Sequence, residues 1–258
     1  KWTIKTKTIK TVGLVEAEVN KIVKDLLSAG PATTLGIYVH LGEVDLKITS
    51  KAPCLPAGLP TGQAGLPTGQ AGRKDGKTAE REIKKLEKKI RKRLGKYIYG
   101  VDSESLEYVI GEMLAKNRKT LAIAESCTGG LIANRITNVN GSSKYFKMGI
   151  VAYSNEAKVN LLGVSKDKIK KYGAVSKQVA LDMAKGVKRL SKADVGLGIT
   201  GIAGPKGATK RKPIGLVYIA VAGDKIKTVK KCLFIGSREE IKLQASIAAL
   251  NLIRNTRI

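Results

Sequence analysis

The first hundred residues alternate between strand-like and helix-like spacing of apolar side chains. Between Ile4 and Val12, β-branched residues alternate with Lys and Thr, which is typical of a half-exposed strand. Helical spacing follows, and Gly30-Pro31 ends that helix. The pattern predicts, in order, a strand at 4–12, a helix at 15–27, strands at 35–40 and 43–49, a charged helix at 78–94 and a strand at 97–99. These elements make a small α+β unit.

A seven-residue repeat interrupts this unit. Residues 59–65 read LPTGQAG, and residues 66–72 repeat the same letters. Pro and Gly at this density do not build the interior of a strand or a helix. We therefore expect a flexible loop over about 53–76 between a strand and the charged helix.

From Asp102 onward, strand-length apolar runs alternate with amphipathic segments. Ser103 is the expected N-cap of a helix that buries Leu106, Ile110 and Leu114. Further on, the pattern predicts strands at 120–124, 148–153, 195–200, 215–222 and 228–235, a helix ending at 136, helices beginning near 155 and 176, and a last helix at 238–254. The expected fold is α/β: a mixed, mostly parallel sheet with helices on both faces in residues 101–258, preceded by the small α+β domain in residues 1–100. Short connections between the last strands predict an antiparallel pair there.

The chain is strongly basic, and its charge is evenly spread. Lys and Arg number 48 against 21 Asp and Glu, for a formal net charge of +27. Residues 1–100 carry 20 basic and 9 acidic side chains, and residues 101–258 carry 28 and 12. A dedicated nucleic-acid tail would be lopsided. A Lys-rich solvated surface is therefore the preferred interpretation, with a nucleic-acid footprint or a surface that gathers anionic metabolites as alternatives.

Histidine and cysteine usage excludes several kinds of site. His40 is the only histidine of the chain, so a Ser-His-Asp triad could form only around His40 and a multi-His metal site within the chain is excluded. Cys54, Cys127 and Cys232 are far apart, which argues against disulfides and zinc and fits a reducing cytoplasm. No apolar run is long enough for a membrane span, and no signal peptide is visible. Because the chain begins at Lys1, we expect a fragment or a trimmed product.

Three polar, Gly-containing segments follow three of the predicted strands, at 125–130, 153–158 and 200–205. Carboxyl ends of parallel strands meet at one edge of a sheet, so these segments are expected to form one site. Ser126, Cys127 and Thr200 are the available nucleophiles. A hydroxyl needs a neighbouring base, and a partly desolvated Lys158 is a candidate, with Tyr153 as proton relay. The alternatives are an ordinary surface lysine at 158 and a small buried side chain at 127, while Glu125 is expected to orient the loop.

An anion site is also expected at this edge. Gly129-Gly130 opens a helix whose free N–H groups would point toward the strand ends. Arg238 stands in the first turn of the last helix, next to a Ser237–Glu240 capping-box spacing. A cation there opposes the helix dipole and invites a compensating phosphate. A merely solvated arginine is the alternative.

Five ordered motifs resemble one family: ESCTGGLIANRIT, GIVAYSNEAKVNLLGV, YGAVSKQVA, GITGIAGP and KPIGLVYIAVAG. They look like the C-terminal nicotinamide mononucleotide deamidase domain of the CinA (competence/damage-inducible) family, over residues 101–258. Residues 1–100 resemble the KH-like middle domain of that family. The N-terminal molybdopterin-binding-like domain of CinA proteins has no counterpart here, so we expect this chain to lack the ADP-ribose pyrophosphatase activity linked to it.

The resemblance implies hydrolysis of nicotinamide mononucleotide to nicotinate mononucleotide and ammonia in pyridine nucleotide recycling, with no cofactor and no metal. It implies a homodimer, and no nucleic acid or membrane partner is expected. Ser126 would be the nucleophile, Lys158 its base and Tyr153 a proton relay. Thr200 and the backbone around Gly201 would hold the substrate or the oxyanion. The substrate-binding positions would be Glu125, Thr128, Gly129, Gly130, Asn155, Gly201 and Arg238.

One segment departs from the family pattern. After Pro205 the chain reads KGATKRKP, where the family usually has a more Gly-rich and acidic stretch. Lys206, Lys210 and Arg211 add positive charge near the expected mouth of the site, which would raise its affinity for phosphate and leaves the substrate preference open. Two alternatives to the enzyme stay open. One is a nucleic-acid module, which the charge and the KH-like unit suggest, although the GQAG matches to a GXXG loop lie in the repeat. The other is a non-catalytic partner in competence or DNA damage.

Overall fold

The computed structural model describes residues 2–27, 30–53 and 74–256. The chain forms two compact units, Lys1–Glu104 and Ser105–Ile258, and each has its own apolar core. The LPTGQAG repeat and Cys54 lie outside the described residues, as does most of the loop predicted at 53–76. None of the helices in the described ranges is long and apolar enough to cross a membrane.

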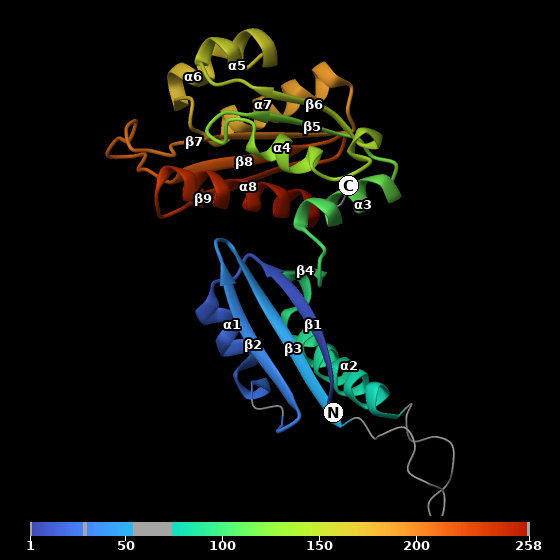
Figure 1. Cartoon of the computed structure of the whole chain (residues 1–258). Coiled ribbons are helices and arrows are strands. Elements are labelled where there is room, and N and C mark those ends of the chain that lie inside the picture. The colour runs from blue at the N-terminus through green and yellow to red at the C-terminus, as the bar shows by residue number, and fades with distance from the viewer. Residues whose placement is uncertain (1, 28–29, 54–73, 257–258) are drawn as a thin grey trace, which may run out of the picture. The chain divides into compact units, whose positions relative to one another are not determined.

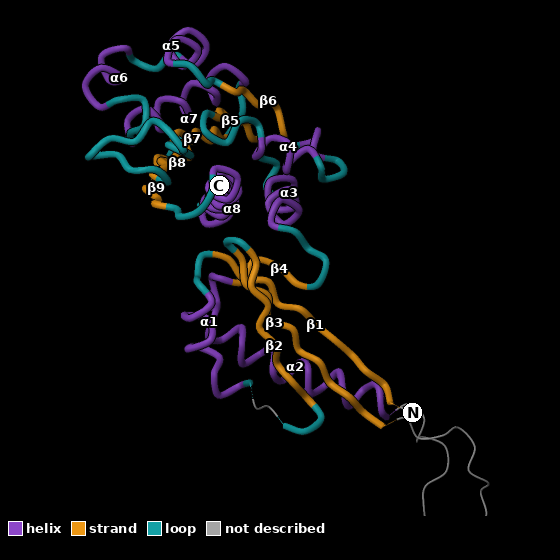
Figure 2. The backbone as a smooth tube through the Cα atoms, turned by 60° about the vertical axis from the view of Figure 1, so that its left-hand side comes forward, coloured by secondary structure: helices purple, strands orange, loops and turns teal. Residues whose placement is uncertain are grey.

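The first unit is a four-stranded antiparallel sheet with helices on one face. Its elements are β1 (Trp2–Val12), α1 (Glu16–Val23), the 3-10 helix η1 (Lys24–Leu26), β2 (Thr33–His40), β3 (Glu43–Pro53), α2 (Lys74–Leu94), the 3-10 helix η3 (Gly95–Tyr97) and β4 (Ile98–Val101). The strand order is β2-β3-β1-β4, and α1 and α2 lie along this sheet (Figure 2). The apolar stripe of α2 is buried as the spacing predicts, through Ile83, Leu86, Ile90 and Leu94.

The second unit is an α/β domain. Its elements are α3 (Leu106–Lys116), β5 (Leu121–Glu125), α4 (Leu131–Thr137), the 3-10 helix η4 (Ser142–Lys144), β6 (Phe146–Val151), α5 (Asn155–Leu162), α6 (Lys166–Tyr172), α7 (Lys177–Ser191), β7 (Val195–Gly201), β8 (Leu216–Ala222), β9 (Lys227–Leu233) and α8 (Arg238–Asn255). The sheet order is β6-β5-β7-β8-β9. β5 is parallel to both of its neighbours, and β8 is antiparallel to both of its own. In this sheet only β8 runs against the other strands, so the mixed sheet is confirmed.

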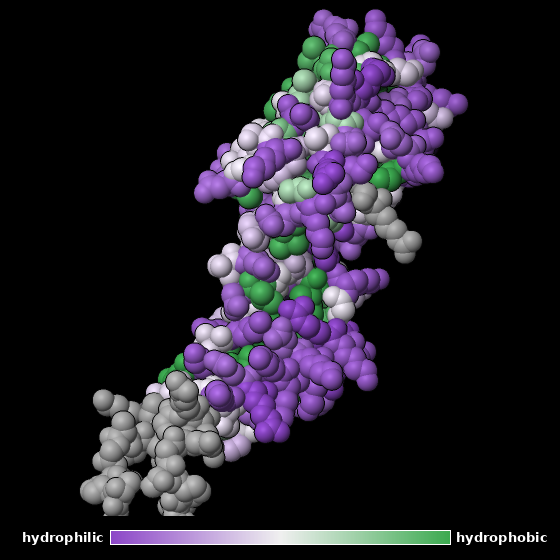
Figure 3. All heavy atoms as spheres, turned by 90° about the vertical axis from the view of Figure 1, so that its right-hand side faces the viewer, coloured by the Kyte–Doolittle hydropathy of each residue, from purple (hydrophilic) through white to green (hydrophobic). Residues whose placement is uncertain are grey.

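Helices cover both faces of this sheet. α7 packs along the strands on one side, and α5 and α6 pack against α7. α3, α4 and α8 contact one another on the opposite side (Figure 1). Aliphatic side chains fill the core, as the low aromatic content of 4% predicts. In Figure 3, hydrophilic side chains cover most of the face shown, as expected for a lysine-rich, solvated surface.

Two details differ from the sequence prediction. Ser105, not Ser103, caps α3, and its Oγ accepts a hydrogen bond from the Tyr108 N–H at 3.2 Å. The helical spacing of the apolar residues fits either start, so the spacing alone does not fix the cap. The second difference is helix α6, which the sequence pattern does not predict. It carries Ile169 and Tyr172 among five charged residues, and two apolar positions are too few to show a helical period.

Three glycines let α7 approach its neighbours closely. A Cβ built on Gly198 of β7 would lie 2.3 Å from the Ala180 carbonyl oxygen of α7. Likewise, a Cβ on Gly196 would lie 2.0 Å from the Ala184 oxygen, and one on Gly186 would lie 2.1 Å from the Leu162 oxygen. These contacts are with backbone, which cannot move aside as a side chain tip does. The small residues therefore set the spacing between α7 and the sheet that ends at the candidate site.

Gly198→Ala is expected to lower the free energy of unfolding by about 2–3 kcal/mol, because α7 must move away from β7. Gly76→Ala is the matched control, since a Cβ at Gly76 of α2 meets nothing within 4 Å. We expect the control to leave stability unchanged or to raise it slightly. Thermal unfolding followed by circular dichroism measures both variants. An unchanged melting temperature in Gly198→Ala would contradict this account of the packing.

Candidate active site

The loops that follow β5, β6 and β7 line one cavity of about 230 Å³. These strands are parallel, so their carboxyl ends share one edge of the sheet. Seven of the eleven residues predicted for the site line this cavity: Ser126, Tyr153, Asn155, Lys158, Thr200, Gly201 and Arg238. The segments that follow three different strands thus meet as the strand pattern predicts, and Arg238 at the start of α8 joins them.

Four predicted residues do not line the cavity: Glu125, Thr128, Gly129 and Gly130. Glu125 is 1% exposed, and its carboxylate accepts hydrogen bonds from the N–H groups of Gly130 (3.0 Å), Ile132 (3.2 Å) and Ala133 (2.8 Å). The start of α4 therefore already holds an internal anion. This corrects the expectation that the Gly129-Gly130 helix start takes a substrate phosphate, and it gives Glu125 the loop-orienting role.

Backbone conformation explains why glycine occupies positions 129 and 130 of this loop. Gly129 and Gly130 adopt φ values of +64° and +96°, in the region that favours glycine. This turn leads from β5 directly into α4. Thr128 is fully buried inside it, and its hydroxyl has no hydrogen-bond partner among the described residues. These three residues shape the loop that presents Ser126.

Glu125→Gln is expected to lower the free energy of unfolding by about 2–3 kcal/mol, since the substitution removes a buried charged acceptor of three N–H groups and adds an amide donor. Glu239→Gln, at an exposed glutamate in α8, is the control and should change little. Denaturant titration of each variant gives the difference. A Glu125→Gln protein as stable as the control would show that the helix start does not depend on this carboxylate.

Burial and hydrogen bonding distinguish the three candidate nucleophiles, Ser126, Cys127 and Thr200. Burial raises the pKa of the Cys127 thiol to about 12, so at neutral pH this side chain is a thiol and a weak nucleophile. The Thr200 hydroxyl is 1% exposed and donates to the Ala174 carbonyl oxygen at 3.0 Å. Ser126 stands at the end of β5 on the cavity wall. Ser126 is therefore the hydroxyl best placed to attack a bound substrate.

Lys158 is the least solvent-accessible cation of the site. It is 2% exposed, and its Nζ donates to the carbonyl oxygens of Ala152 (3.0 Å), Tyr153 (2.8 Å) and Ser154 (3.4 Å). Burial lowers the pKa of the Lys158 amine below the ordinary lysine value. A Cys127 thiolate would oppose this shift, but Cys127 is uncharged at neutral pH. The structure thus excludes an ordinary surface lysine at this position.

The cavity has a buried end and an exposed end. Ser126, Lys158 and Thr200 are at most 7% exposed. At the other end, Tyr153 is 60% exposed, and its hydroxyl accepts a hydrogen bond from Arg238 Nη2 at 3.0 Å. Arg238 Nη1 donates to the Gly204 carbonyl oxygen. The role of Tyr153 as proton relay stays a prediction, since the bond that its hydroxyl makes is to Arg238.

Arg238 is held by the helix that it begins. The predicted capping box of α8 is present: the Ser237 side chain accepts from the Glu240 N–H, and the Glu240 carboxylate accepts from the Ser237 N–H at 2.7 Å. The box fixes the first turn of α8, and the two guanidinium bonds then tie this turn to the ends of β6 and β7.

Cys127 and residues 202–204 of the lining lie in the segments that the sequence pattern places at the site, and Lys206 lies in the basic stretch expected near its mouth. Sequence reasoning missed Ala174 and Val175 before α7, and Gly207 in the loop between β7 and β8. The YGAVSKQVA motif was a signal for the segment before α7. The cluster of cations after Pro205 was a signal for Lys206. Within the described residues, His, Cys, Asp and Glu form no group that could hold a metal ion.

Two family models match the chain. The model of the CinA C-terminal domain matches residues 103–257, the whole unit that carries the cavity. The chain belongs to the CinA family. The model of the damage-inducible protein CinA KH domain matches residues 6–54, in the first unit. Both matches agree with the resemblance carried by the sequence motifs.

Several CinA proteins are similar to this chain. A CinA-like protein of Kosmotoga olearia is 41% identical over 251 residues, which are 96% of this chain and 55% of that protein. A Thermoanaerobacter pseudethanolicus protein with the competence-damage inducible name is 43% identical over 253 residues, 98% of this chain and 56% of its own length. The chain thus spans about half the length of these CinA relatives.

Solved CinA structures match the second unit. The competence/damage inducible protein of Agrobacterium tumefaciens is 37% identical with a TM-score of 0.57, and the match covers 58% of this chain and 92% of that one. A CinA superfamily protein of Escherichia coli is 28% identical with a TM-score of 0.56, over 63% of this chain and 98% of that one. The α/β fold of the unit with the cavity is therefore the CinA fold.

Proposed function

We propose that this chain hydrolyses the carboxamide of nicotinamide mononucleotide, giving nicotinate mononucleotide and ammonia. The observation that carries the proposal is that a buried serine and a desolvated lysine line the same cavity. A serine with an amine base is a sufficient pair for acyl transfer. The substrate comes from the resemblance of the sequence motifs to nicotinamide mononucleotide deamidase domains.

The burial gradient of the cavity orients the substrate. The carboxamide lies at the buried end, against Ser126 and Lys158, and the ribose phosphate lies at the exposed end near Arg238. The Thr200 hydroxyl donates its hydrogen bond to the Ala174 carbonyl oxygen. Its oxygen is therefore an acceptor, suited to the N–H of a carboxamide rather than to an oxyanion. Asn155, which also lines the cavity, offers both a donor and an acceptor.

The first half of the reaction transfers the acyl group to the enzyme. The Ser126 oxygen attacks the carboxamide carbon, and its proton passes to the neutral amine of Lys158. The carbon–nitrogen bond then breaks, and Lys158 returns that proton to the departing nitrogen, which leaves as ammonia. Burial lowers the pKa of Lys158, which favours the neutral amine that this step needs.

The second half of the reaction consumes water. A water molecule enters the place that ammonia has left and attacks the ester carbon, and Lys158 takes one of its protons. The ester bond breaks, the proton returns to the Ser126 oxygen, and nicotinate mononucleotide is released. Each step uses the same two side chains, so loss of either should stop the whole cycle.

The test is product formation by the wild-type chain without added metal. Nicotinamide mononucleotide is incubated with the protein, and ammonia and nicotinate mononucleotide are measured in the same samples. We expect the two products in equal amounts. A folded protein that forms neither would overturn the proposal and favour the alternative of a non-catalytic partner in competence or DNA damage. Assembly as a homodimer stays a separate prediction.

A further inference from the structure

Three basic side chains line the wall of the catalytic cavity. Among the described residues they are Lys158, Lys206 and Arg238, and no carboxylate lines the wall. Lys158 acts as a neutral amine in the proposed reaction, so Lys206 and Arg238 supply the positive charge. Charges of one sign in a concave, low-dielectric site add to one another and attract the opposite charge, so the cavity suits an anion.

Of these three basic side chains, Lys206 and Arg238 are available to a phosphate. Lys158 is 2% exposed at the buried end, and its Nζ is held by three backbone carbonyls. Lys206 and Arg238 lie at the exposed end. The volume of about 230 Å³ is below the roughly 300–1,000 Å³ typical of sites that enclose a whole ligand. The cavity therefore does not enclose a whole nucleotide. With the ring and its carboxamide at the buried end, the rest of the nucleotide would lie among the exposed cations.

The β7–β8 loop that carries Lys206 is fixed on both sides of this residue. Before it, the Gly204 carbonyl oxygen accepts a hydrogen bond from Arg238. After it, the Lys212 amine donates to the Tyr172 carbonyl oxygen at the end of α6. Thr209 and Lys212 exchange two backbone hydrogen bonds of 2.9 and 3.1 Å, which close a tight turn. The backbone of Lys206 is thus placed at the cavity mouth rather than on a free tip.

The two cations have complementary donors. The contacts to Gly204 and Tyr153 use one N–H on each terminal nitrogen of Arg238, out of five N–H bonds in a guanidinium. Lys206 brings an ammonium with three rotatable donors. A phosphate has three terminal oxygens and a charge near −2 at neutral pH, so two cations are suited to neutralise it.

We propose that Lys206 and Arg238 form the subsite for the substrate phosphate, and that Lys206 makes the cavity select phosphorylated over unphosphorylated carboxamides. This inference rests on the proposed amidohydrolase function. In this subsite the two cations take the role expected of the Gly129-Gly130 helix start, whose N–H groups are bonded to the Glu125 carboxylate. It also gives a function to the basic segment after Pro205, which departs from the family pattern.

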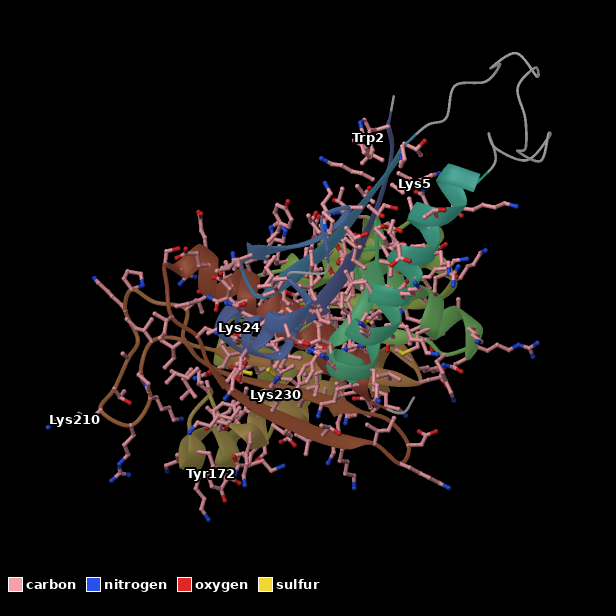
Figure 4. All side chains as sticks on the ribbon, turned by 90° about the horizontal axis from the view of Figure 1, so that it is seen from below. Trp2, Lys5, Lys24, Tyr172, Lys210 and Lys230 are labelled. Atoms are coloured by element: carbon pink, nitrogen blue, oxygen red, sulfur yellow. The ribbon has the colours of Figure 1, made fainter. Side chains whose placement is uncertain are left out.

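The same loop offers a matched control. Lys210 has the same charge and lies four residues after Lys206, but it does not line the cavity. Figure 4 shows it at the outer end of the loop, extending into solvent. A long-range effect of net charge would be similar for Lys206→Gln and Lys210→Gln. Only a direct contact with phosphate separates the two variants.

The experiment compares nicotinamide mononucleotide with nicotinamide riboside, which keeps the carboxamide and lacks the phosphate. For Lys206→Gln we expect kcat/KM on the mononucleotide to fall at least about tenfold, through KM, with kcat within about twofold of wild type. We expect its kcat/KM on the riboside to be unchanged. Lys210→Gln should match wild type on both substrates.

Two results would overturn the subsite. One is an equal loss on both substrates, and the other is a Lys206→Gln protein that matches Lys210→Gln. If the wild type releases ammonia from neither substrate, the proposed function fails while the subsite is still testable. Binding of ribose 5-phosphate, measured by calorimetry, should then be weaker in Lys206→Gln than in Lys210→Gln. Equal binding by these two variants would reject the subsite as well.

Discussion

Ser126→Ala should abolish ammonia release from nicotinamide mononucleotide, with kcat falling by at least about 10³-fold. The reason is that the acyl group has no other acceptor in the cavity. The Cys127 thiol is held protonated by a pKa of about 12, and the Thr200 hydroxyl is bonded to a backbone carbonyl. The substitution removes one hydroxyl from a cavity wall, so the fold should persist.

Three measurements accompany this prediction. Circular dichroism and the melting temperature should match those of the wild type, which separates lost chemistry from lost folding. Ser143→Ala, at an exposed serine of η4, is the control for the loss of a serine hydroxyl and should keep full activity. Binding of nicotinamide mononucleotide to Ser126→Ala should remain, because the phosphate contacts are untouched. A Ser126→Ala protein within tenfold of wild-type kcat would reject Ser126 as the nucleophile.

Lys158→Met should lower kcat by about 10²–10⁴-fold, the usual contribution of a positioned general base. Methionine has a similar length and no amine, so it fills the buried space while removing the proton acceptor. Lys185→Met, at an exposed lysine of α7, is the matched control and should leave kcat unchanged. Full activity of Lys158→Met would leave no role for this amine in the reaction.

The pH dependence gives a second, independent readout of Lys158. Only the neutral amine accepts a proton, so the rate should rise with pH until the pKa of Lys158 is passed and level off above it. Burial lowers that pKa, so the plateau should begin below the ordinary lysine value of 10.5. Measurements above pH 7 avoid the titration of the substrate phosphate, whose second pKa is near 6. Lys158→Met should lose the rising limb. If the rate of Lys158→Met still rises with pH in this way, another group is the base.

Most of the fold follows from local patterns in the sequence. The strands are visible because β-branched residues alternate or run together between Gly-containing turns. The helices are visible where an apolar stripe lasts three turns, as in α2 and α3. Helix α6 fails this condition, since only Ile169 of this lysine-rich helix packs against the core cluster that includes α7 residues. The contact is tertiary and leaves no period in the sequence.

The candidate site also has a part that the sequence predicts and a part that it does not. Ser126, Lys158 and Thr200 follow predicted parallel strands, and topology alone brings strand ends together. Gly129-Gly130 misled the phosphate prediction because glycines after a strand serve both phosphate loops and tight turns of positive φ. The deciding group is the Glu125 carboxylate, and its three N–H donors become visible only once the loop is folded.

The sequence places Lys206 only in part. Together with Lys210 and Arg211 it adds positive charge after Pro205, near the expected mouth of the site. The sequence does not say which of these three side chains lines the cavity, because that depends on two contacts of long sequence separation, Arg238 with Gly204 and Lys212 with Tyr172. Neither contact has a local signature.

The most direct test of the central claim is trapping of the acyl group by hydroxylamine during turnover of nicotinamide mononucleotide. An acyl ester on Ser126 partitions between water and hydroxylamine, so the account predicts ammonia together with both nicotinate mononucleotide and its hydroxamate. Both acyl products should be lost in Ser126→Ala. Ammonia release without hydroxamate at any hydroxylamine concentration, or hydroxamate formation that persists in Ser126→Ala, would contradict a serine amidohydrolase at this cavity.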